Sequence, residues 1–236
     1  MLDHEQLAEF AERGYLLVPD AVPEHLLAAA SRAVDGLEPP PPQLQGPHHH
    51  FLDAAQYPPL QALLTDSQAF SLAECLTGPG TLDVPPQVQV ALNIPPFPHR
   101  PGMHHIDGAP HEPDGRPGTF TLLAGILLTD QLSNDMGNLW VWPGTHLTHA
   151  AYFREHGPEA FFDANGYPPI ALPEPEQITG RAGDLLLAHY LLGHNIGGNT
   201  STATRCAVYF RIKRTGHDPH WRAFLQDPWF DYAPFR

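Results

Sequence analysis

The N-terminal residues carry the pattern of an amphipathic helix with both of its ends marked. Asp3 and Gln6 stand three positions apart, which is the spacing of a capping box, and Leu7 and Phe10 follow as an apolar face. Gly14 then supplies the conformational freedom that helix C-termini favour. The pattern predicts a helix that begins after Asp3 and ends at Gly14.

Further helical segments are predicted before residue 85. The run YLLVP (15–19) predicts a short strand, and residues 22–37 predict a second helix with Pro23 near its start and Gly36 at its end. The positions expected to face inward on this helix are Leu26, Leu27, Ala30 and Val34. The stretch EPPPPQLQGPHHH (38–50) is predicted to be a loop, and residues 58–78 to form a third helical region.

The pattern changes at residue 85, after which short apolar or alternating runs are separated by Gly, Pro, Asn and Asp. The runs are QVQVALNIP, TFTLLAGILLTD, GNLWVWPG, GDLLLAHYLLG and TRCAVYFRIKR. Such runs are typical of antiparallel strands with helices packed outside them. We expect one domain over 1–236, mainly β with flanking helices: a mainly helical part at 1–84, a jelly-roll core at 85–215 and a C-terminal extension at 216–236.

The net charge of the chain limits the kinds of molecule that it is expected to bind. The chain has 12 Lys and Arg against 26 Asp and Glu, a net charge of -14, which disfavours nucleic acids and anionic membranes and favours a small-molecule substrate. No apolar run reaches the roughly 20 residues of a membrane helix, and the N-terminus lacks the features of a signal peptide. We therefore expect a cytoplasmic protein that binds a small molecule.

Lysine and cysteine usage limits the chemistry further. Cys75 and Cys206 lack the spacing of a thiolate metal site or a disulfide framework, so both are expected to be buried thiols. Lys213 is the only lysine in the chain. A fixed cation for an anionic ligand should consequently be an arginine.

The segment RPGMHHIDGAPH (100–111) contains a candidate metal chelate. Side chains two positions apart on a strand share a face, so His105 and Asp107 can reach one point while His104 and Ile106 point away. With one more histidine, such a pair forms the facial triad of non-haem Fe(II) oxygenases. In a chain with 16 histidines this spacing alone is weak evidence, and it depends on a third ligand elsewhere.

The third ligand is predicted in GDLLLAHYLLGHNIGGNTSTATR (183–205). His194 is followed by a loop rich in Gly and Asn and, eleven positions later, by Arg205 on a predicted strand. The returning strand can place the guanidinium in the cavity that holds the metal, where it can clamp one end of a dicarboxylate whose other end chelates the metal. His189 is the rival for this position, but the spacing to Arg205 favours His194 and leaves His189 as a core or neighbouring residue.

Taken together, these motifs resemble the phytanoyl-CoA dioxygenase family of Fe(II)/2-oxoglutarate oxygenases over nearly the whole chain. The matching stretches are FAERGYLLVPDAVPEHLLAAA, HHID, GNLWVWPGTH and GDLLLAHYLLGHNIGGNTSTATR. The resemblance implies a double-stranded β-helix fold (a cupin-like jelly roll) and three iron ligands: His105, Asp107 and His194. It also implies that Arg205 binds the C5 carboxylate of 2-oxoglutarate, with Gln89 and Asn93 as further contacts to this cosubstrate.

The activity that the resemblance implies is a dioxygenase reaction that uses Fe(II), O2 and 2-oxoglutarate and releases succinate. Asp107 is retained where halogenating members of the family have a small residue, which favours hydroxylation of a small organic molecule, or a related oxidation, over halogenation. Many relatives have a serine contact to the cosubstrate shortly after the distal histidine. Ile196 replaces it here, so that contact is lost or supplied elsewhere.

Other histidines near these motifs are expected to have roles other than metal binding. His104 is expected to be a hydrogen-bonded neighbour rather than a ligand, and His111 a neighbour that makes a hydrogen bond or a substrate contact. The run HHH (48–50) follows a proline-rich stretch and is expected in a solvated loop, with a place at the mouth of the active site as the alternative.

Candidate substrate contacts are Trp140, Arg100 and Arg116. The stretch WVW (140–142) is expected to alternate between core and surface, with Trp140 as a possible substrate contact, and the two arginines flank the H-x-D segment. The aromatic stretch HWRAFLQDPWFDY (220–232) can form a lid or pack against the outer sheet.

Two alternative functions belong to different classes. A non-oxygenase cupin-type metalloenzyme that uses Zn or Mn would leave Arg205 without a purpose. A non-catalytic binding module on the same scaffold is disfavoured because the triad and Arg205 are all present.

Overall fold

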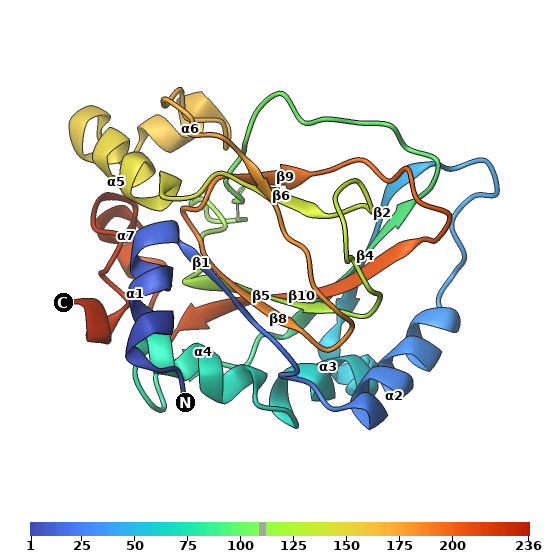
Figure 1. The fold of residues 1–236 in the computed structure, drawn as a ribbon. Coiled ribbons are helices and arrows are strands. Elements are labelled where there is room, and N and C mark those ends of the chain that lie inside the picture. The colour runs from blue at the N-terminus through green and yellow to red at the C-terminus, as the bar shows by residue number, and fades with distance from the viewer. Residues whose placement is uncertain (109–111) are drawn as a thin grey trace.

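Two antiparallel sheets form the centre of the protein, as the computed structural model of residues 1–108 and 112–236 shows (Figure 1). The strands of the larger sheet are β1 (Tyr15–Val18), β2 (Gly46–Asp53), β3 (Leu82–Asp83), β4 (Gln87–Ile94), β5 (Leu122–Leu127), β8 (Leu185–His189) and β10 (Arg205–Arg214). Six of them lie in the order β1-β8-β5-β10-β4-β2, and β3 pairs with the end of β10. The smaller sheet, in the order β7-β6-β9, contains β6 (Leu139–Val141), β7 (Glu176–Gln177) and β9 (His194–Ile196).

Helices cover the outside of this core. They are α1 (His4–Arg13), α2 (Glu24–Asp35), α3 (Pro58–Thr65), α4 (Ala69–Thr77), α5 (Thr145–His156), α6 (Ala160–Ala164) and α7 (Trp221–Gln226), with 3-10 turns at Ala54–Gln56, Asp218–His220 and Ala233–Phe235. In Figure 1, α2, α3 and α4 lie below the larger sheet, and α5, α6 and α7 lie at the left. The smaller sheet lies on the opposite side of the larger one from α3 and α4. The predicted class, mainly β with flanking helices, is confirmed.

The first helix has the termini that its sequence predicts. The Asp3 carboxylate accepts a hydrogen bond from the Gln6 amide at 2.8 Å, and the Gln6 side chain accepts one from the Asp3 amide at 3.0 Å. Gly14 adopts φ 78° and ends the helix. A β-carbon at Gly14 would lie 2.4 Å from the Nδ1 atom of His146, so this glycine is required for packing as well as for its backbone angle.

The prediction of a loop over 38–50 is wrong for its last five residues. Residues 46–50 belong to β2, which pairs with β4 so that His49 lies opposite Ala91 and Phe51 opposite Gln89. β2 is the edge strand of the larger sheet. An edge strand tolerates Pro47 and needs no apolar face, so its sequence lacks the hydrophobic signal of a buried strand. The predicted third helical region is present as α3 and α4, separated by residues 66–68.

The C-terminal segment packs beside α1 and α5. Phe224 and Tyr232 stack against the ring of His189, with centroid distances of 5.7 and 4.8 Å. The Tyr232 hydroxyl donates to the Thr121 carbonyl at 2.6 Å, and Asp231 accepts from Thr121 and from His217. These contacts attach the segment to the end of β8 and to Thr121 directly before β5.

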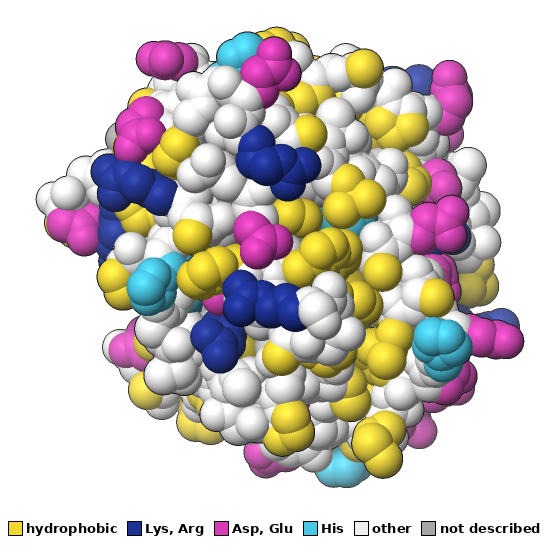
Figure 2. Space-filling view, turned by 90° about the vertical axis from the view of Figure 1, so that its left-hand side faces the viewer, with side chains coloured by type: hydrophobic (Ala, Val, Ile, Leu, Met, Phe, Trp, Pro, Cys, Tyr) yellow, Lys and Arg dark blue, Asp and Glu magenta, His cyan; other side chains and the backbone are white. Residues whose placement is uncertain are grey.

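Two arginines near the C-terminus are paired with acidic side chains. Figure 2 looks onto the side that lies at the left of Figure 1, where Lys and Arg groups alternate with acidic and hydrophobic side chains. Arg222 pairs with Glu159 at 2.7 Å and Arg236 with Asp227 at 3.9 Å. Among the described residues, no helix is long and apolar enough to cross a membrane.

Candidate metal centre

Two histidines from distant parts of the chain face each other across a pair of backbone hydrogen bonds. The His105 amide donates to the His194 carbonyl at 2.9 Å, and the His194 amide donates to the His105 carbonyl at 3.0 Å. His194 also pairs with Val141 of β6, which fixes it in the smaller sheet. Directly opposed residues of an antiparallel pair project to the same face, and the two imidazole centroids lie 4.5 Å apart.

Asp107 completes the cluster two positions after His105. Its Oδ1 atom lies 3.7 Å from Nε2 of His105 and 3.8 Å from Nε2 of His194. The segment is a single β-bridge rather than a continuous strand, but the expected alternation holds, since Ile106 is buried on the other side. The three candidate ligand atoms lie within 4.8 Å of one another, the only such group among the residues that the structure describes.

The donor atoms fit a divalent transition metal. Nδ1 of His194 lies 3.0 Å from the Leu192 carbonyl and must donate to it, so Nε2 carries the free lone pair. Burial lowers the pKa of His105 to about 3, which keeps its imidazole neutral. Burial alone would raise the pKa of Asp107, but Arg211 and the two histidines lower it, so the carboxylate is ionised. Two imidazoles and one carboxylate on one face are the facial triad, which leaves other coordination positions open.

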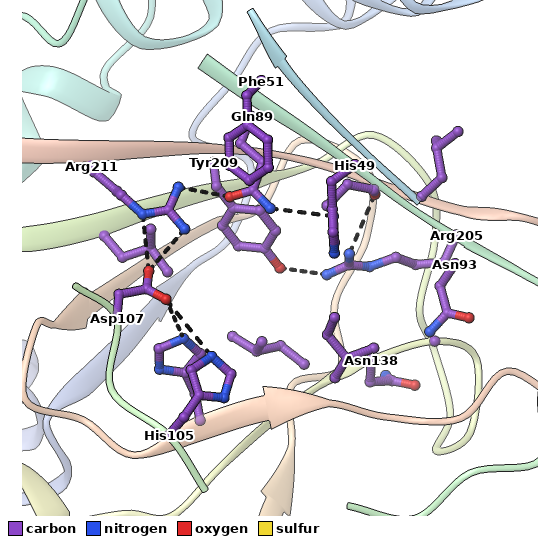
Figure 3. Close-up of a pocket in the computed structure, with 17 residues that line it drawn as sticks. His49, Phe51, Gln89, Asn93, His105, Asp107, Asn138, Arg205, Tyr209 and Arg211 are labelled. Atoms are coloured by element: carbon purple, nitrogen blue, oxygen red, sulfur yellow. Dashed lines mark hydrogen bonds and ion pairs between the residues drawn. The ribbon is translucent and has the colours of Figure 1, made fainter. Parts of the chain in front are cut away.

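The triad lines a cavity of about 260 Å³ between the two sheets (Figure 3). The other lining residues are His49, Phe51, Gln89, Ala91, Leu92, Asn93, Leu123, Gly137, Asn138, Leu139, Ile196, Arg205, Tyr209 and Arg211. Ile196, the residue that stands in place of the family's serine, therefore adds an apolar side chain to this wall.

Arg205 lies on the side of the cavity opposite His105 and Asp107 (Figure 3). It is 7% exposed, and its guanidinium donates to the Tyr209 hydroxyl, to Gln131 Oε1 at 3.4 Å and to the Ala91 carbonyl at 3.4 Å. Among the described residues its hydrogen-bond partners are therefore all neutral. A buried cation without a counter-ion is costly, so this position is suited to an anionic ligand.

Gln89 and Asn93 line the same cavity from β4. The Gln89 amide lies between Arg211, which donates to its Oε1 at 2.7 Å, and the ring of His49, 3.3 Å from its Nε2. Asn93 donates to the Gly197 carbonyl at 2.8 Å, and its Oδ1 is buried without a partner among the described residues. Both side chains thus line the cavity, and their contact with the cosubstrate stays a prediction.

Four polar residues of the cavity were not predicted from the sequence: His49, Asn138, Tyr209 and Arg211. The period-two pattern of TRCAVYFRIKR puts Arg205, Tyr209 and Arg211 on one face of β10, so this signal was available. His49 could not be found because β2 was predicted to be a loop. The alternative place for the HHH run, at the mouth of the site, is the one that His49 occupies.

His189 and His104 lie where the sequence suggested. His189 is in the core, where its Nε2 lies 2.7 Å from the Pro228 carbonyl and its Nδ1 accepts from the Leu191 amide. His104 points away from the triad, and its Nε2 is 2.8 Å from Nε2 of His149. His111 falls outside the described residues.

The three predicted substrate contacts do not line this cavity. Arg100 is exposed, and Arg116 forms ion pairs with Asp114 and Asp218, both at 2.8 Å. The indole of Trp140 packs at Gly197, where a β-carbon would lie 2.4 Å from it. The structure therefore does not bring these side chains together with the triad.

The fold and the cluster define a class, the jelly-roll metalloproteins with a two-histidine, one-carboxylate facial triad. The phytanoyl-CoA dioxygenase (PhyH) family matches residues 94–207, the segment that contains the triad and Arg205. This match confirms the predicted resemblance to that family over this segment, and it supports the class of Fe(II)/2-oxoglutarate-dependent oxygenases. A comparison with curated protein sequences found no match.

Solved structures with the same fold cover nearly the whole chain. HygX from Streptomyces hygroscopicus, with nickel and 2-oxoglutarate bound, is 17% identical with a TM-score of 0.64, over 92% of this chain and 89% of that one. SnoK, a non-heme alpha ketoglutarate dependent carbocyclase from nogalamycin biosynthesis, is 26% identical with a TM-score of 0.62, over 88% and 82%. EctD from S. alaskensis, with 2-oxoglutarate and 5-hydroxyectoine, is 21% identical with a TM-score of 0.58, over 90% and 76%.

Proposed function

We propose that this protein is an Fe(II)/2-oxoglutarate-dependent dioxygenase that hydroxylates a small organic molecule and converts 2-oxoglutarate to succinate and carbon dioxide. His105, Asp107 and His194 hold the iron. Arg205 binds the C5 carboxylate of 2-oxoglutarate. When bound, iron and 2-oxoglutarate supply the activation of O2, and the chain supplies binding, orientation and exclusion of water.

The observation that carries this proposal is the buried Arg205 across the cavity from the triad. A cupin-type enzyme that uses only the metal has no need of a buried guanidinium whose partners are a phenol, an amide and a carbonyl. A dicarboxylate supplies the missing negative charge at one end and metal-binding oxygens at the other. Gln89 and Asn93 line the same cavity from β4 and orient the cosubstrate by hydrogen bonds.

The solved relatives support the cosubstrate and the size of the substrate. HygX has been crystallised with 2-oxoglutarate and hygromycin B, and EctD with 2-oxoglutarate and 5-hydroxyectoine. SnoK shows that the same fold and cosubstrate also serve a carbocyclase. Retention of Asp107 argues against halogenation. Product analysis separates hydroxylation from ring formation, because only hydroxylation adds an oxygen atom to the product.

The prime substrate is proposed to enter through a second cavity, of about 430 Å³, that shares Gln89, Tyr209 and Arg211 with the first. Its other lining residues are Asp83, Val84, Pro85, Pro86, Gln87, Glu112, Gly118, Phe120 and Lys213. Lys213 is already paired with Asp218 at 2.8 Å. A neutral molecule with an apolar face fits this lining better than a CoA thioester, whose phosphates would meet two carboxylates. Trp140, Arg100 and Arg116 line neither cavity.

Release of labelled carbon dioxide from 2-oxoglutarate tests the proposal directly. The apoprotein with Fe(II), ascorbate and 2-oxoglutarate labelled at C1 should turn over slowly without prime substrate. Arg205→Ala should lower kcat/KM for 2-oxoglutarate by about 30-fold or more, because a charged pair is lost. Arg214→Ala, on the same strand, is the matched control and should behave as the wild type. No metal-dependent release, or equal release by Arg205→Ala, would show that the protein has another function.

Screening small molecules for stimulated succinate formation then identifies the substrate class. The screen has two arms. The first contains coenzyme A thioesters, and the second contains neutral polycyclic or hydroxylated compounds. The proposal expects stimulation in the second arm only.

A further inference from the structure

Arg211 connects the metal site to the wall of the cosubstrate cavity (Figure 3). Its Nε and Nη2 atoms donate to Oδ2 of Asp107 at 2.9 and 2.8 Å, and its Nη1 donates to Oε1 of Gln89 at 2.7 Å. The guanidinium carbon also lies 5.9 Å from the Phe51 ring centroid and 5.8 Å from that of Phe120. Three hydrogen bonds and two contacts with aromatic rings therefore position the Arg211 side chain.

The two oxygens of Asp107 have different partners. Oδ2 accepts both Arg211 bonds, whereas Oδ1 is the atom nearest to the histidines. A carboxylate can bind a metal through one oxygen or through both, and a charge-assisted pair of bonds to Oδ2 opposes the second mode.

We infer that Arg211 is a positioning residue that restricts Asp107 to one-oxygen metal coordination and, through Gln89, ties this geometry to the binding of 2-oxoglutarate. One-oxygen coordination matters because the triad must leave three positions for the cosubstrate and oxygen. A second Asp107 oxygen on the metal would take one of them. The part of the inference that concerns 2-oxoglutarate rests on the proposed function, and the part that concerns the metal does not.

The same guanidinium fixes the direction of the Gln89 amide. Arginine can only donate, so Gln89 must turn its Oε1 towards Arg211 and its Nε2 towards the cavity and His49. Gln89 is thereby set as a donor to a ligand in the cavity. A displaced Arg211 would release both Asp107 and Gln89 at once.

Lysine cannot take over this arrangement. An ammonium group can approach Asp107 and restore the charge, but it lacks the planar set of donors that reaches Asp107 and Gln89 in fixed directions. The charge and the geometry of Arg211 can therefore be separated by comparing Arg211→Lys with Arg211→Gln.

The first measurement is the affinity of the apoprotein for Mn(II), determined by calorimetry without 2-oxoglutarate. Arg211→Gln should weaken Mn(II) binding by about 10- to 100-fold, the effect typical of losing a partner of a metal ligand. Arg211→Lys should bind Mn(II) within a few-fold of the wild type. Arg214→Gln removes the same charge from the same strand and is the matched control. Wild-type Mn(II) affinity in Arg211→Gln would overturn the inference, whatever the outcome for turnover.

The second measurement is 2-oxoglutarate affinity of the Mn(II)-saturated protein, with the visible charge-transfer absorption of the anaerobic Fe(II) complex as a spectroscopic check. Gln89→Leu should keep the Mn(II) affinity and weaken 2-oxoglutarate binding, and Arg211→Lys should show the same split. If Arg211 had only a structural role, its replacement would lower the thermal stability without this difference between Mn(II) affinity and 2-oxoglutarate affinity. If 2-oxoglutarate binds equally well to all variants, the link through Gln89 is wrong. If it binds to none, the wild type included, the proposed function fails instead.

Discussion

Nε2 of His149 lies 2.8 Å from Nε2 of His104, and Nδ1 of His149 lies 2.6 Å from the Leu191 carbonyl. The carbonyl can only accept, so His149 donates from Nδ1 and accepts at Nε2, and His104 must be protonated at Nε2. His104 directly precedes His105, and Leu191 stands shortly before His194, the two histidines proposed as metal ligands. His149 of α5 therefore ties together the two segments that carry the proposed histidine ligands.

Replacing His149 by phenylalanine should destabilise the protein. The change leaves the Leu191 carbonyl and the His104 N–H buried without partners, at a cost of about 1–3 kcal/mol each. Urea-induced unfolding of the apoprotein should show a fall of about 2–5 kcal/mol in the free energy of unfolding. His156→Phe, at an exposed position on the same helix, is the control and should change it by less than about 0.5 kcal/mol. An equal effect of the two changes would mean that the His149 contacts contribute nothing.

Acid should destabilise the protein over the pH range in which its buried histidines stay neutral in the folded state but become protonated in the unfolded state. Burial lowers the pKa of His146 to about 4 and that of His149 to about 3, whereas an unfolded imidazole titrates near 6.5. Between these values the unfolded state binds more protons, so the stability present above pH 6.5 is lost as pH falls.

The unfolding free energy measured from pH 7 to 5 should therefore decrease, and His149→Phe should reduce this slope by up to about 1.4 kcal/mol per pH unit. His156→Phe should leave the slope unchanged. A wild-type stability that is flat over this range would contradict the assignment of neutral buried imidazoles.

We expect His194 to be a metal ligand and His189 to be a core residue. His194→Ala should abolish tight Mn(II) binding, because it removes one of three ligands. His189→Gln should retain one Mn(II) per chain and lower the melting temperature, since His189 bonds to Pro228 and Leu191 in the core. Calorimetric titration and thermal unfolding of both variants check this division. Loss of metal in His189→Gln together with normal binding in His194→Ala would reverse the assignment.

Gly137 should control the anion end of the cavity. It adopts φ 83°, and a β-carbon there would lie 2.9 Å from the β-carbon of Arg205 and 3.0 Å from that of Asn93. Gly137→Ala should raise the KM for 2-oxoglutarate in addition to the backbone cost of about 1–2 kcal/mol.

Gly115 is a matched control for this change, because it has the same φ of 83° and nothing within 4 Å of an added β-carbon. Gly115→Ala should show the stability loss without the change in KM. Steady-state kinetics of the two variants with 2-oxoglutarate distinguish them, and an unchanged KM in Gly137→Ala would show that Arg205 and Asn93 do not depend on this close approach.

Much of the fold follows from local patterns. The capping box at Asp3, the terminator at Gly14 and the alternating runs from residue 85 lead to α1 and to the strands β4, β5, β6, β8 and β10, because helix ends and strand faces are set by neighbouring residues. Strand β2 was not predictable in this way. Its histidines form no hydrophobic pattern, so this edge strand is defined only by its backbone pairing with β4.

The sequence by itself determined which residue types are available for a metal and an anion: an H-x-D, a distal histidine and an arginine on the following strand. Spacing carries this information since the side chains of a strand alternate. Only the tertiary structure decided that His105 and His194 share one backbone pair, that Arg205 is buried with neutral partners, and that Arg211 divides the oxygens of Asp107. These relationships join residues far apart in the chain, so they depend on sheet pairing and burial, which no local pattern contains.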